Sequence, residues 1–182
     1  MRLHILRHTK PRIAEGLCYG QTDVDVFDAD CVSLAQKLAS QLQAGLPVFS
    51  SPLQRCARLA GLLHTEPVFD ERLQELNFGT WEMQAWDAIP RADVDAWAAA
   101  PASYKPGGVE SAIDLAQRVI NWLNDMRALN IPEAIVVTHA GVIRMLLAWR
   151  AGMRAEELAE LVCAQNRSLA FGEYQEILVF HT

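Results

Sequence analysis

The chain opens with MRLHILRHT, residues 1–9, a short apolar run that ends on Arg7 and His8. Two later stretches have the same form, LPVFS at residues 46–50 and AIVVT at residues 134–138. Each is rich in apolar side chains and is followed by a turn and then by helical periodicity. This is how a strand buried on both faces appears in a sequence. We therefore expect three parallel, neighbouring strands in one sheet.

Cationic and imidazole side chains follow each of these strands. Arg7 and His8 end the first strand, Arg55 lies shortly after the second, and His139 directly follows the third. Ligands of an open α/β sheet bind outside the carboxyl ends of its strands. The four side chains should therefore converge, and two arginines with two histidines suit a phosphoryl group.

Composition limits the class of protein. A chain of 182 residues, 51% of them hydrophobic, can bury one sizeable core, and its length fits a single domain over residues 1–182. The formal net charge of −6 argues against nucleic acid and against an anionic membrane surface as partners. Neither a signal peptide nor an apolar run of spanning length is recognisable, so we expect a cytoplasmic protein.

The four cysteines are scattered. They form no CxxC pair and have no histidine at metal-ligand spacing. A zinc site or a disulfide framework is therefore not expected, and the thiols should be reduced and mostly buried. We expect neither a metal nor a cofactor.

Capping residues mark the starts of three helices. These are Asp30, Ser51 with Pro52 at the first helical position, and Ser111, where Asp114 completes a capping box. The other expected elements are helices over residues 141–149 and 156–163 and two closing strands over residues 169–174 and 177–180. We expect these two strands to form an antiparallel edge of the sheet. This order predicts a three-layer α/β/α sandwich with a mostly parallel sheet.

Residues 66–108 interrupt this order with a segment that is long for a plain connection. The segment contains four prolines and three tryptophans, Trp81, Trp86 and Trp97. Long insertions are often lids or substrate walls, and we expect one of these here. Packing in a core is the alternative for each tryptophan.

The chemistry of phosphoryl transfer assigns a role to each converging group. A phosphomonoester dianion repels an anion, so neutral His8 is a suitable nucleophile. Arg7 and Arg55 offer planar forks to the phosphoryl oxygens, and His139 can donate to a third oxygen. The leaving alkoxide needs a proton from a carboxylic acid, for which Glu75 is the best candidate.

Two further acids are alternatives to Glu75. Glu82 follows a Phe-Gly-Thr-Trp turn and would more naturally orient that loop. Glu110 lies beside the expected helix cap, where backbone amides offer it a local partner. Both are therefore weaker candidates for the acid.

Four motifs stand in the order of a known family. Residues 6–9 (LRHT) resemble its RHG signature, and residues 50–55 (SSPLQR) resemble its SSPLxR element. Residues 73–82 (LQELNFGTWE) resemble its LxE and FGxWE segment, and residues 137–141 (VTHAG) its second-histidine motif. The chain is thus similar, nearly end to end, to the histidine phosphatase (phosphoglycerate mutase-like) superfamily.

Within that superfamily the chain resembles the alpha-ribazole phosphatase branch of cobalamin nucleotide-loop assembly. The resemblance lies in residues 16–23 (GLCYGQTD) and 106–111 (PGGVES). It implies a small-molecule phosphomonoester substrate, alpha-ribazole 5'-phosphate or cobalamin 5'-phosphate. Tyr19 and Gln21 are candidate contacts to its nucleoside part, with a local turn as the alternative explanation.

The family resemblance also implies a metal-free hydrolysis in two steps. His8 would become a phosphohistidine while Glu75 protonates the leaving oxygen, and water activated by Glu75 would then release phosphate. Arg7, Arg55 and His139 would hold the phosphoryl oxygens throughout.

Thr9 departs from the family pattern, because it stands where the signature has glycine. The loop must therefore adopt a conformation that a β-branched residue tolerates. Its position beside the nucleophile also makes Thr9 a candidate substrate contact.

Other functions stay open beside this one. In the family, phosphoglycerate mutase-type phosphotransferases have longer insertions and more basic residues than this chain has. A catalytically inactive binding protein would be expected to lose one of the five catalytic positions. A broad-specificity phosphatase is harder to separate, because sequence does not reveal pocket shape. The sequence leaves the oligomeric state open, a homodimer included.

Overall fold

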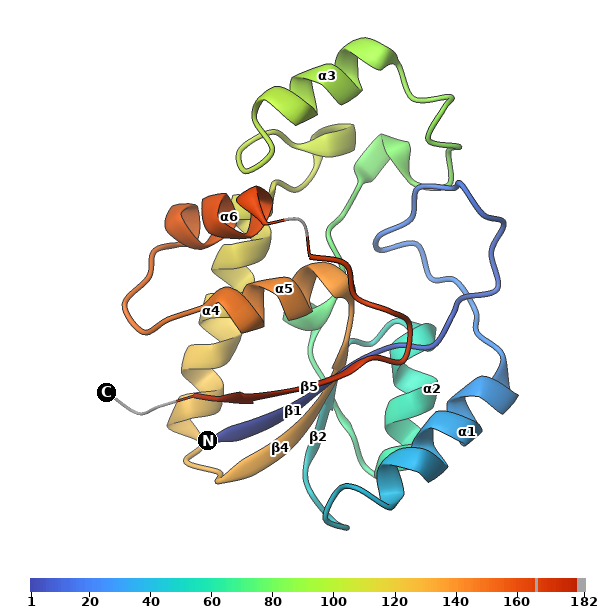
Figure 1. Cartoon of the computed structure of the whole chain (residues 1–182), viewed down its shortest axis with the longest axis vertical. Helices are drawn as coiled ribbons and strands as arrows, with labels where there is room; N and C mark the ends of the chain where they lie inside the picture. Colours follow the sequence, from blue (N-terminus) through green and yellow to red (C-terminus); the bar gives the residue numbers. More distant parts are fainter. Residues whose placement is uncertain (166, 180–182) are drawn as a thin grey trace.

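The structure is a computed structural model and describes residues 1–165 and 167–179. Its centre is one five-stranded sheet in the order β3-β2-β4-β1-β5 (Figure 1). The three strands predicted from the sequence are β1 (Arg2–Arg7), β2 (Val48–Ser50) and β4 (Glu133–Thr138). They are parallel neighbours, with β4 between the other two, so this prediction is confirmed.

The two edge strands were less predictable. β3 (Val68–Phe69) pairs in parallel with β2, and its two residues are too few to carry a periodic signal. β5 (Tyr174–Leu178) pairs antiparallel with β1, as expected for the closing edge.

The prediction of two closing strands is wrong, because one strand lies where two were expected. Gly172, with a φ of 71°, lies in a turn and donates its N–H to the His8 carbonyl oxygen. The region from residue 169 to residue 173 is therefore a turn packed against the end of β1, and pairing begins only at Tyr174. Phe180, the expected end of the second strand, lies outside the described residues.

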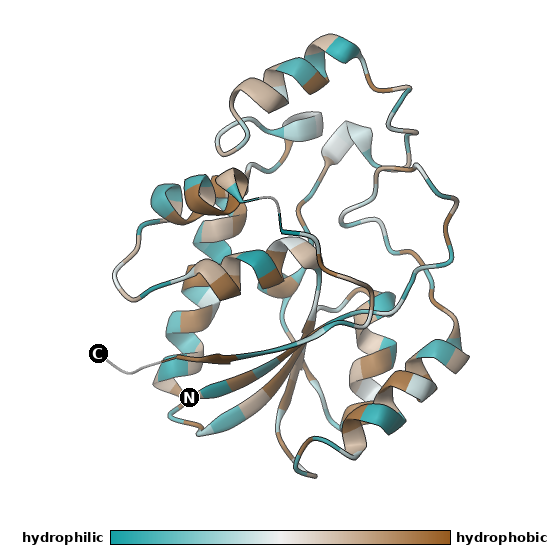
Figure 2. Cartoon of the chain, viewed as in Figure 1, coloured by the Kyte–Doolittle hydropathy of each residue, from teal (hydrophilic) through white to brown (hydrophobic). Residues whose placement is uncertain are grey.

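Helices cover both faces of the sheet, which confirms the three-layer α/β/α sandwich (Figure 1). Alternate strand residues point to opposite faces, so Ala134 and Val136 pack on one side and Ile135 and Val137 on the other. Figure 2 shows hydrophobic and polar residues alternating along the helices, as in amphipathic elements. The first face carries α4 (Ala112–Ala128), α5 (Ala140–Ala148) and α6 (Ala155–Ala164), and the second carries α1 (Asp28–Ala39) and α2 (Gln54–Leu63).

The three predicted caps have different outcomes. Ser111 and Asp114 form the capping box of α4 as predicted. Asp30 lies within the first turn of α1, where its charge suits the helix N-terminus, but Phe27 is the N-cap. Helix α2 begins at Gln54 rather than at Pro52, so the prediction that Ser51 caps it is wrong.

Residues 66–108 carry the chain away from the sheet toward the top of Figure 1. Trp81 is buried in a small cluster of its own, whereas Trp86 is 40% exposed and stacks on Trp97 with ring centroids 6.2 Å apart. Beyond β3, the segment contains η1 (Glu71–Leu73), η2 (Gly79–Trp81), α3 (Arg91–Ala99) and η3 (Pro106–Gly108).

None of the described helices has the length and apolar character needed to cross a membrane.

All four cysteines are free thiols, as expected. Three of them, Cys18, Cys31 and Cys56, are buried, and Cys163 is half-buried. Burial raises the pKa of Cys18 to about 12, so that thiol stays protonated at neutral pH.

Candidate active site

A cavity of about 210 Å³ lies at the carboxyl ends of β1 and β4. The topology rule for α/β sheets predicts a ligand site at this edge. All five residues that we predicted to be catalytic line the cavity. They are Arg7, His8, Arg55, Glu75 and His139, and Leu17, Tyr19, Phe78 and Trp86 complete the wall.

His8 follows β1 directly and is only 2% exposed. Its Nδ1 donates to the Thr9 carbonyl oxygen at 2.7 Å, which leaves Nε2 of the neutral ring without a proton. Burial, and next the positive charge of Arg55, lower the pKa of His8 to about 3. At neutral pH the ring therefore offers a lone pair on Nε2, as a nucleophile requires.

His139 precedes α5 and lies close to His8, with ring centroids 5.1 Å apart. Burial, followed by the charge of Arg55, holds the pKa of His139 well below its ordinary value. Nδ1 accepts from Arg55 Nε at 3.3 Å, so the proton of the neutral ring lies on Nε2, 2.8 Å from the Ser51 hydroxyl oxygen. A phosphoryl oxygen would have to replace the Ser51 hydroxyl at Nε2 to receive the hydrogen bond that we predicted.

Arg55 lies in the first turn of α2 and is fully buried. Its terminal nitrogens donate to the carbonyl oxygens of Thr22, at 2.8 Å, and of Gly20. Among the described residues, no carboxylate forms an ion pair with it. A buried guanidinium held only by neutral groups favours an incoming anion, because the anion supplies the missing countercharge.

Glu82 organises the loop that holds Arg55. Its carboxylate accepts from the backbone N–H groups of Gly20, Gln21 and Thr22 at 2.9, 2.8 and 3.0 Å. Burial acts to raise the pKa of Glu82, but hydrogen bonds from the Thr22 hydroxyl and from the loop amides outweigh it and lower the pKa. The carboxylate thus stays ionised and fixes the carbonyl oxygens that bind Arg55.

Arg7 ends β1 and contacts the turn that precedes β5. Its guanidinium carbon lies 4.0 Å from the centroid of the Phe171 ring, and Nη1 donates to the Leu169 carbonyl oxygen. Nε is buried and has no hydrogen-bond partner among the described residues. The guanidinium therefore has a donor that no described residue uses.

The Glu75 carboxylate meets the start of α5. Its Oε2 accepts from the Gly141 N–H at 3.1 Å, and Oε1 accepts from the Leu76 N–H at 3.0 Å. A Cβ atom on Gly141 would collide with Oε1. Residue 141 must therefore be glycine for the carboxylate to approach the helix this closely.

The alternative acids are held elsewhere. Glu82 serves the loop that holds Arg55, and Glu110 forms an ion pair with Arg118. The prediction that Glu110 has a local amide partner is wrong, because it accepts from the distant N–H of Asn77. Neither acid lines the cavity, and among the described residues Glu75 supplies the carboxyl group in its wall.

The three predicted substrate contacts from the loops differ in placement. Tyr19 lines the cavity. Gln21 instead donates to the Glu75 carbonyl oxygen, and the Thr9 hydroxyl contacts the Cys31 sulfur at 3.3 Å. Among the described residues other than glycine, only Met83 and Asn130 have a positive φ. Thr9 therefore has a negative φ, which a β-branched side chain tolerates.

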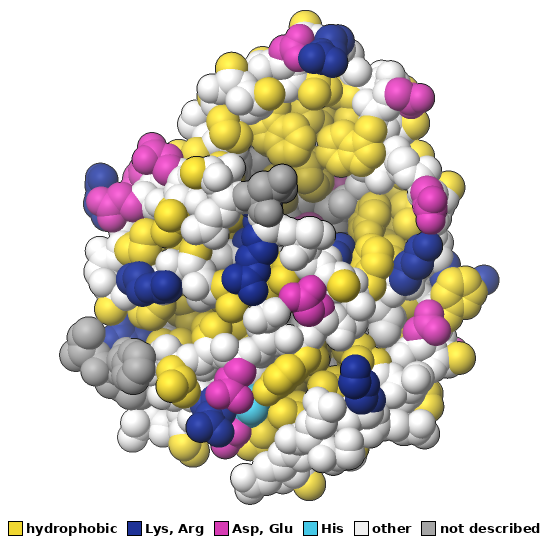
Figure 3. Space-filling view, in the orientation of Figure 1, with side chains coloured by type: hydrophobic (Ala, Val, Ile, Leu, Met, Phe, Trp, Pro, Cys, Tyr) yellow, Lys and Arg dark blue, Asp and Glu magenta, His cyan; other side chains and the backbone are white. Residues whose placement is uncertain are grey.

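A second cavity of about 470 Å³ adjoins the first and shares Arg7, Tyr19, Glu75 and Phe78 with it. Figure 3 shows hydrophobic side chains gathered below α3 on this face, with basic side chains lower down. The rest of the wall of this second cavity is mostly apolar and includes Leu76, Trp97, Pro101, Leu115, Met145 and Val162, together with Arg144 and Arg167.

The sequence matches the family model of the histidine phosphatase superfamily (branch 1) over residues 3–177. The protein belongs to this superfamily. Membership confirms the resemblance drawn from the four motifs and makes the protein a phosphatase, with a phosphate-bearing small molecule as substrate.

Individual relatives of the phosphatase carry different descriptions. A protein described as "Putative phosphoserine phosphatase 2", from Hydrogenobacter thermophilus, is 26% identical over 166 residues, which are 86% of this chain and 82% of that protein. The alpha-ribazole phosphatase of Shigella flexneri is 25% identical with a TM-score of 0.73, covering 88% of this chain and 84% of that one. A phosphoglycerate mutase of Thermus thermophilus is 30% identical with a TM-score of 0.64, covering 85% and 86%.

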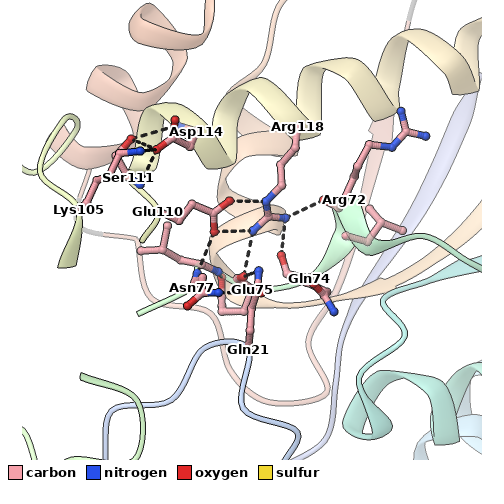
Figure 4. A network of polar contacts seen from close by, with 12 residues as sticks. Gln21, Arg72, Gln74, Glu75, Asn77, Lys105, Glu110, Ser111, Asp114 and Arg118 are labelled. Carbon is pink, nitrogen blue, oxygen red and sulfur yellow. Dashed lines mark hydrogen bonds and ion pairs between the residues drawn. The ribbon is translucent and has the colours of Figure 1, made fainter. Parts of the chain in front are cut away.

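Sequence reasoning missed two side chains around the site. Ser51 was assigned to a helix cap, yet its hydroxyl contacts His139. Arg118 binds backbone carbonyl oxygens next to Glu75 (Figure 4). A signal for Arg118 exists, since it lies three residues after Leu115 on the inward stripe of α4, where an arginine needs buried partners.

Proposed function

We propose that this phosphatase hydrolyses phosphomonoesters in two steps, without a metal ion, through a phosphohistidine on His8. His8 Nε2 forms a bond to phosphorus as the ester P–O bond breaks, and Glu75 gives its proton to the leaving oxygen. Glu75 then takes a proton from the water that attacks phosphorus, and the N–P bond breaks to release phosphate. Arg7 and Arg55 bind the phosphoryl oxygens in both steps.

The state of His8 supports this proposal most directly. Its hydrogen bond to the Thr9 carbonyl oxygen and its lowered pKa leave Nε2 as a free base inside a cationic cavity. The donors around it are guanidinium groups. Within the described part of the chain, His, Cys, Asp and Glu side chains form no group of three that could hold a metal ion.

The proposed substrate is alpha-ribazole 5'-phosphate, or the corresponding cobalamin 5'-phosphate. The observation that carries this choice is the apolar cavity of about 470 Å³ beside the cationic one. A leaving group with an aromatic base would cover Trp97 and the neighbouring apolar wall. Serine or glycerate is too small to do so and would leave this wall exposed to water. The resemblance of residues 16–23 to the alpha-ribazole phosphatase branch supports the same choice.

We further propose that residues 66–108 act as a substrate wall. Phe78 and Trp97 of this segment line the larger cavity, and Phe78 and Trp86 line the smaller one. The segment therefore supplies part of the wall of both cavities. This gives the aromatic cluster a part in recognition besides its packing.

A turnover panel tests the substrate. It compares alpha-ribazole 5'-phosphate with phosphoserine, phosphoglycerates, sugar phosphates and nucleotides under the same conditions. We expect the highest kcat/KM for alpha-ribazole 5'-phosphate. A preference for phosphoserine, or similar values across the panel, would contradict this choice and indicate a different or broad specificity.

The phosphotransferase alternative has one observation in its favour, the 30% identity to a phosphoglycerate mutase. In the same panel a mutase would convert one phosphoglycerate into its isomer without releasing phosphate. A catalytically inactive relative would turn over none of the compounds. A cytoplasmic location, a homodimer and a single domain over residues 1–182 stay predictions.

A further inference from the structure

A largely buried ion pair lies beside the backbone of Glu75 (Figure 4). Nε and Nη2 of Arg118, on α4, meet the two carboxylate oxygens of Glu110 at 2.6 and 3.1 Å. The side chains of Arg118 and Glu110 are only 16% and 12% exposed. Neither residue lines either cavity, so any effect on the chemistry must pass through a neighbour.

Arg118 uses its remaining donors on the backbone that leads to the acid. Nη1 donates to the carbonyl oxygens of Arg72 and Gln74 at 2.7 and 2.6 Å. Nη2 donates to the Glu75 carbonyl oxygen at 2.9 Å. Together with the contacts to Glu110, all five N–H groups of the guanidinium are used.

The chain on the other side of Glu75 is held by the same pair. Glu110 Oε2 accepts from the Asn77 N–H at 2.8 Å. Gln21 adds a second link, because its amide donates to the Glu75 carbonyl oxygen at 3.0 Å and accepts from Asn77 Nδ2 at 3.1 Å. The backbone is therefore fixed both before and after Glu75.

We propose that Arg118, with Glu110 as its counter-ion, is a positioning residue for Glu75. The inference rests on the acid role proposed above for Glu75. Arg118 fixes the backbone from which the carboxyl group reaches the cavity and thereby sets its distance to the leaving oxygen. Displacement of a reacting group by about 1 Å can cost on the order of 100-fold in rate.

A lysine cannot replace this arrangement. Its ammonium presents three donors on one nitrogen, whereas the planar guanidinium spans a carboxylate and three carbonyl oxygens at once. Arg118→Lys therefore keeps the charge while it releases most of the backbone. Glu110→Gln keeps an acceptor for the Asn77 N–H but loses the ionic contact with Arg118.

A merely structural ion pair would act on all substrates alike. Loss of the pair would lower stability, because three partly buried carbonyl oxygens would lose their donors. An effect through Glu75, by contrast, should grow with the basicity of the leaving group, since a nitrophenolate barely needs an acid. The two explanations therefore differ in leaving-group sensitivity.

The test compares kcat/KM for an alkyl phosphate and for 4-nitrophenyl phosphate. We expect Arg118→Lys and Glu110→Gln to lose about 10- to 100-fold more on the alkyl phosphate than on 4-nitrophenyl phosphate. Arg72→Gln is the matched control. It breaks ion pairs with Asp70 and Asp125 in the same region but leaves the backbone contacts of Arg118 in place.

The double variant Arg118→Lys with Glu75→Gln sharpens the test. In the Glu75→Gln background the acid is already absent. Arg118→Lys should therefore add no further dependence on the leaving group. Equal losses on both substrates for Arg118→Lys and Glu110→Gln would overturn the positioning role. If Arg118→Lys fails to fold, judged by circular dichroism, Glu110→Gln decides by the same comparison.

Failure of the underlying acid role has a different signature. If Glu75→Gln loses activity equally on both substrates, Glu75 is not the acid, and the proposed mechanism and the positioning role fall together. If Glu75→Gln is sensitive to the leaving group while Arg118→Lys and Glu110→Gln are not, the mechanism stands and only the positioning role is contradicted.

Discussion

His8 is stabilised as a neutral base by its surroundings, and this has a consequence for folding. In the folded protein its pKa is about 3, because of burial first and the charge of Arg55 second. In the unfolded chain the pKa of a histidine is about 6.5. Between these values the unfolded state binds more protons, so the stability contributed by neutral His8 is complete above pH 6.5 and is lost as pH falls toward 3.

We therefore predict that His8→Asn makes the protein less sensitive to acid. The asparagine amide can still donate to the Thr9 carbonyl oxygen, but it does not titrate. Between pH 7 and pH 4 the parent should lose about 3 kcal/mol of unfolding free energy through His8, and the variant should not. Urea unfolding at both pH values measures the difference. An equal loss in both proteins would contradict the low pKa of His8.

At the residue scale, strand ends made the cavity lined by these side chains predictable. Arg7, His8 and His139 end or follow parallel strands, so their convergence follows from topology alone. The directions of loop side chains were not predictable. Thr9 and Gln21 face Cys31 and the Glu75 backbone because they lie in irregular loop segments, whose conformations no periodicity encodes.

At the element scale, the start of α5 contacts the carboxylate of Glu75, the proposed acid. Gly141 Cα lies so close to Glu75 that a methyl group would collide with Oε1. We predict that Gly141→Ala lowers kcat on alkyl phosphates by about 10- to 100-fold, because the carboxyl group must move. The substitution should not lower the free energy of unfolding by weakening α5, since alanine forms helices more readily than glycine.

Gly61→Ala in α2 is the matched control for this substitution. A Cβ atom at Gly61 meets no atom within 4 Å, so activity should be unchanged. Full activity of Gly141→Ala would show that the contact between Glu75 and α5 does not position the acid.

Element boundaries show where sequence patterns stop being decisive. Ser111 with Asp114 encodes its own cap locally, and the structure follows it. Ser51 carries the same kind of signal, but its hydroxyl contacts His139 and the helix begins later, at Gln54. The hydroxyl also accepts from the Leu53 N–H at 3.3 Å, so the local signal is present without fixing the residue at which the helix begins.

At the scale of the whole molecule, the arrangement of charge predicts independence from metal ions. The cationic groups at the cavity are Arg7 and Arg55, both covalent parts of the chain. We expect EDTA to leave kcat/KM unchanged and added magnesium or zinc to give no stimulation. Loss of activity with chelator and its return with a divalent ion would contradict the proposed arginine clamp.

The central claim is that phosphate passes through His8, and trapping the intermediate tests it most directly. The Glu75→Gln variant, mixed rapidly with 4-nitrophenyl phosphate, should accumulate the phosphoenzyme, because the leaving group needs no acid whereas the attacking water lacks its base. We predict a base-stable, acid-labile phosphate that peptide mapping places on His8 and that is absent from His8→Asn. Turnover without such a label, or a label on another residue, would contradict the account.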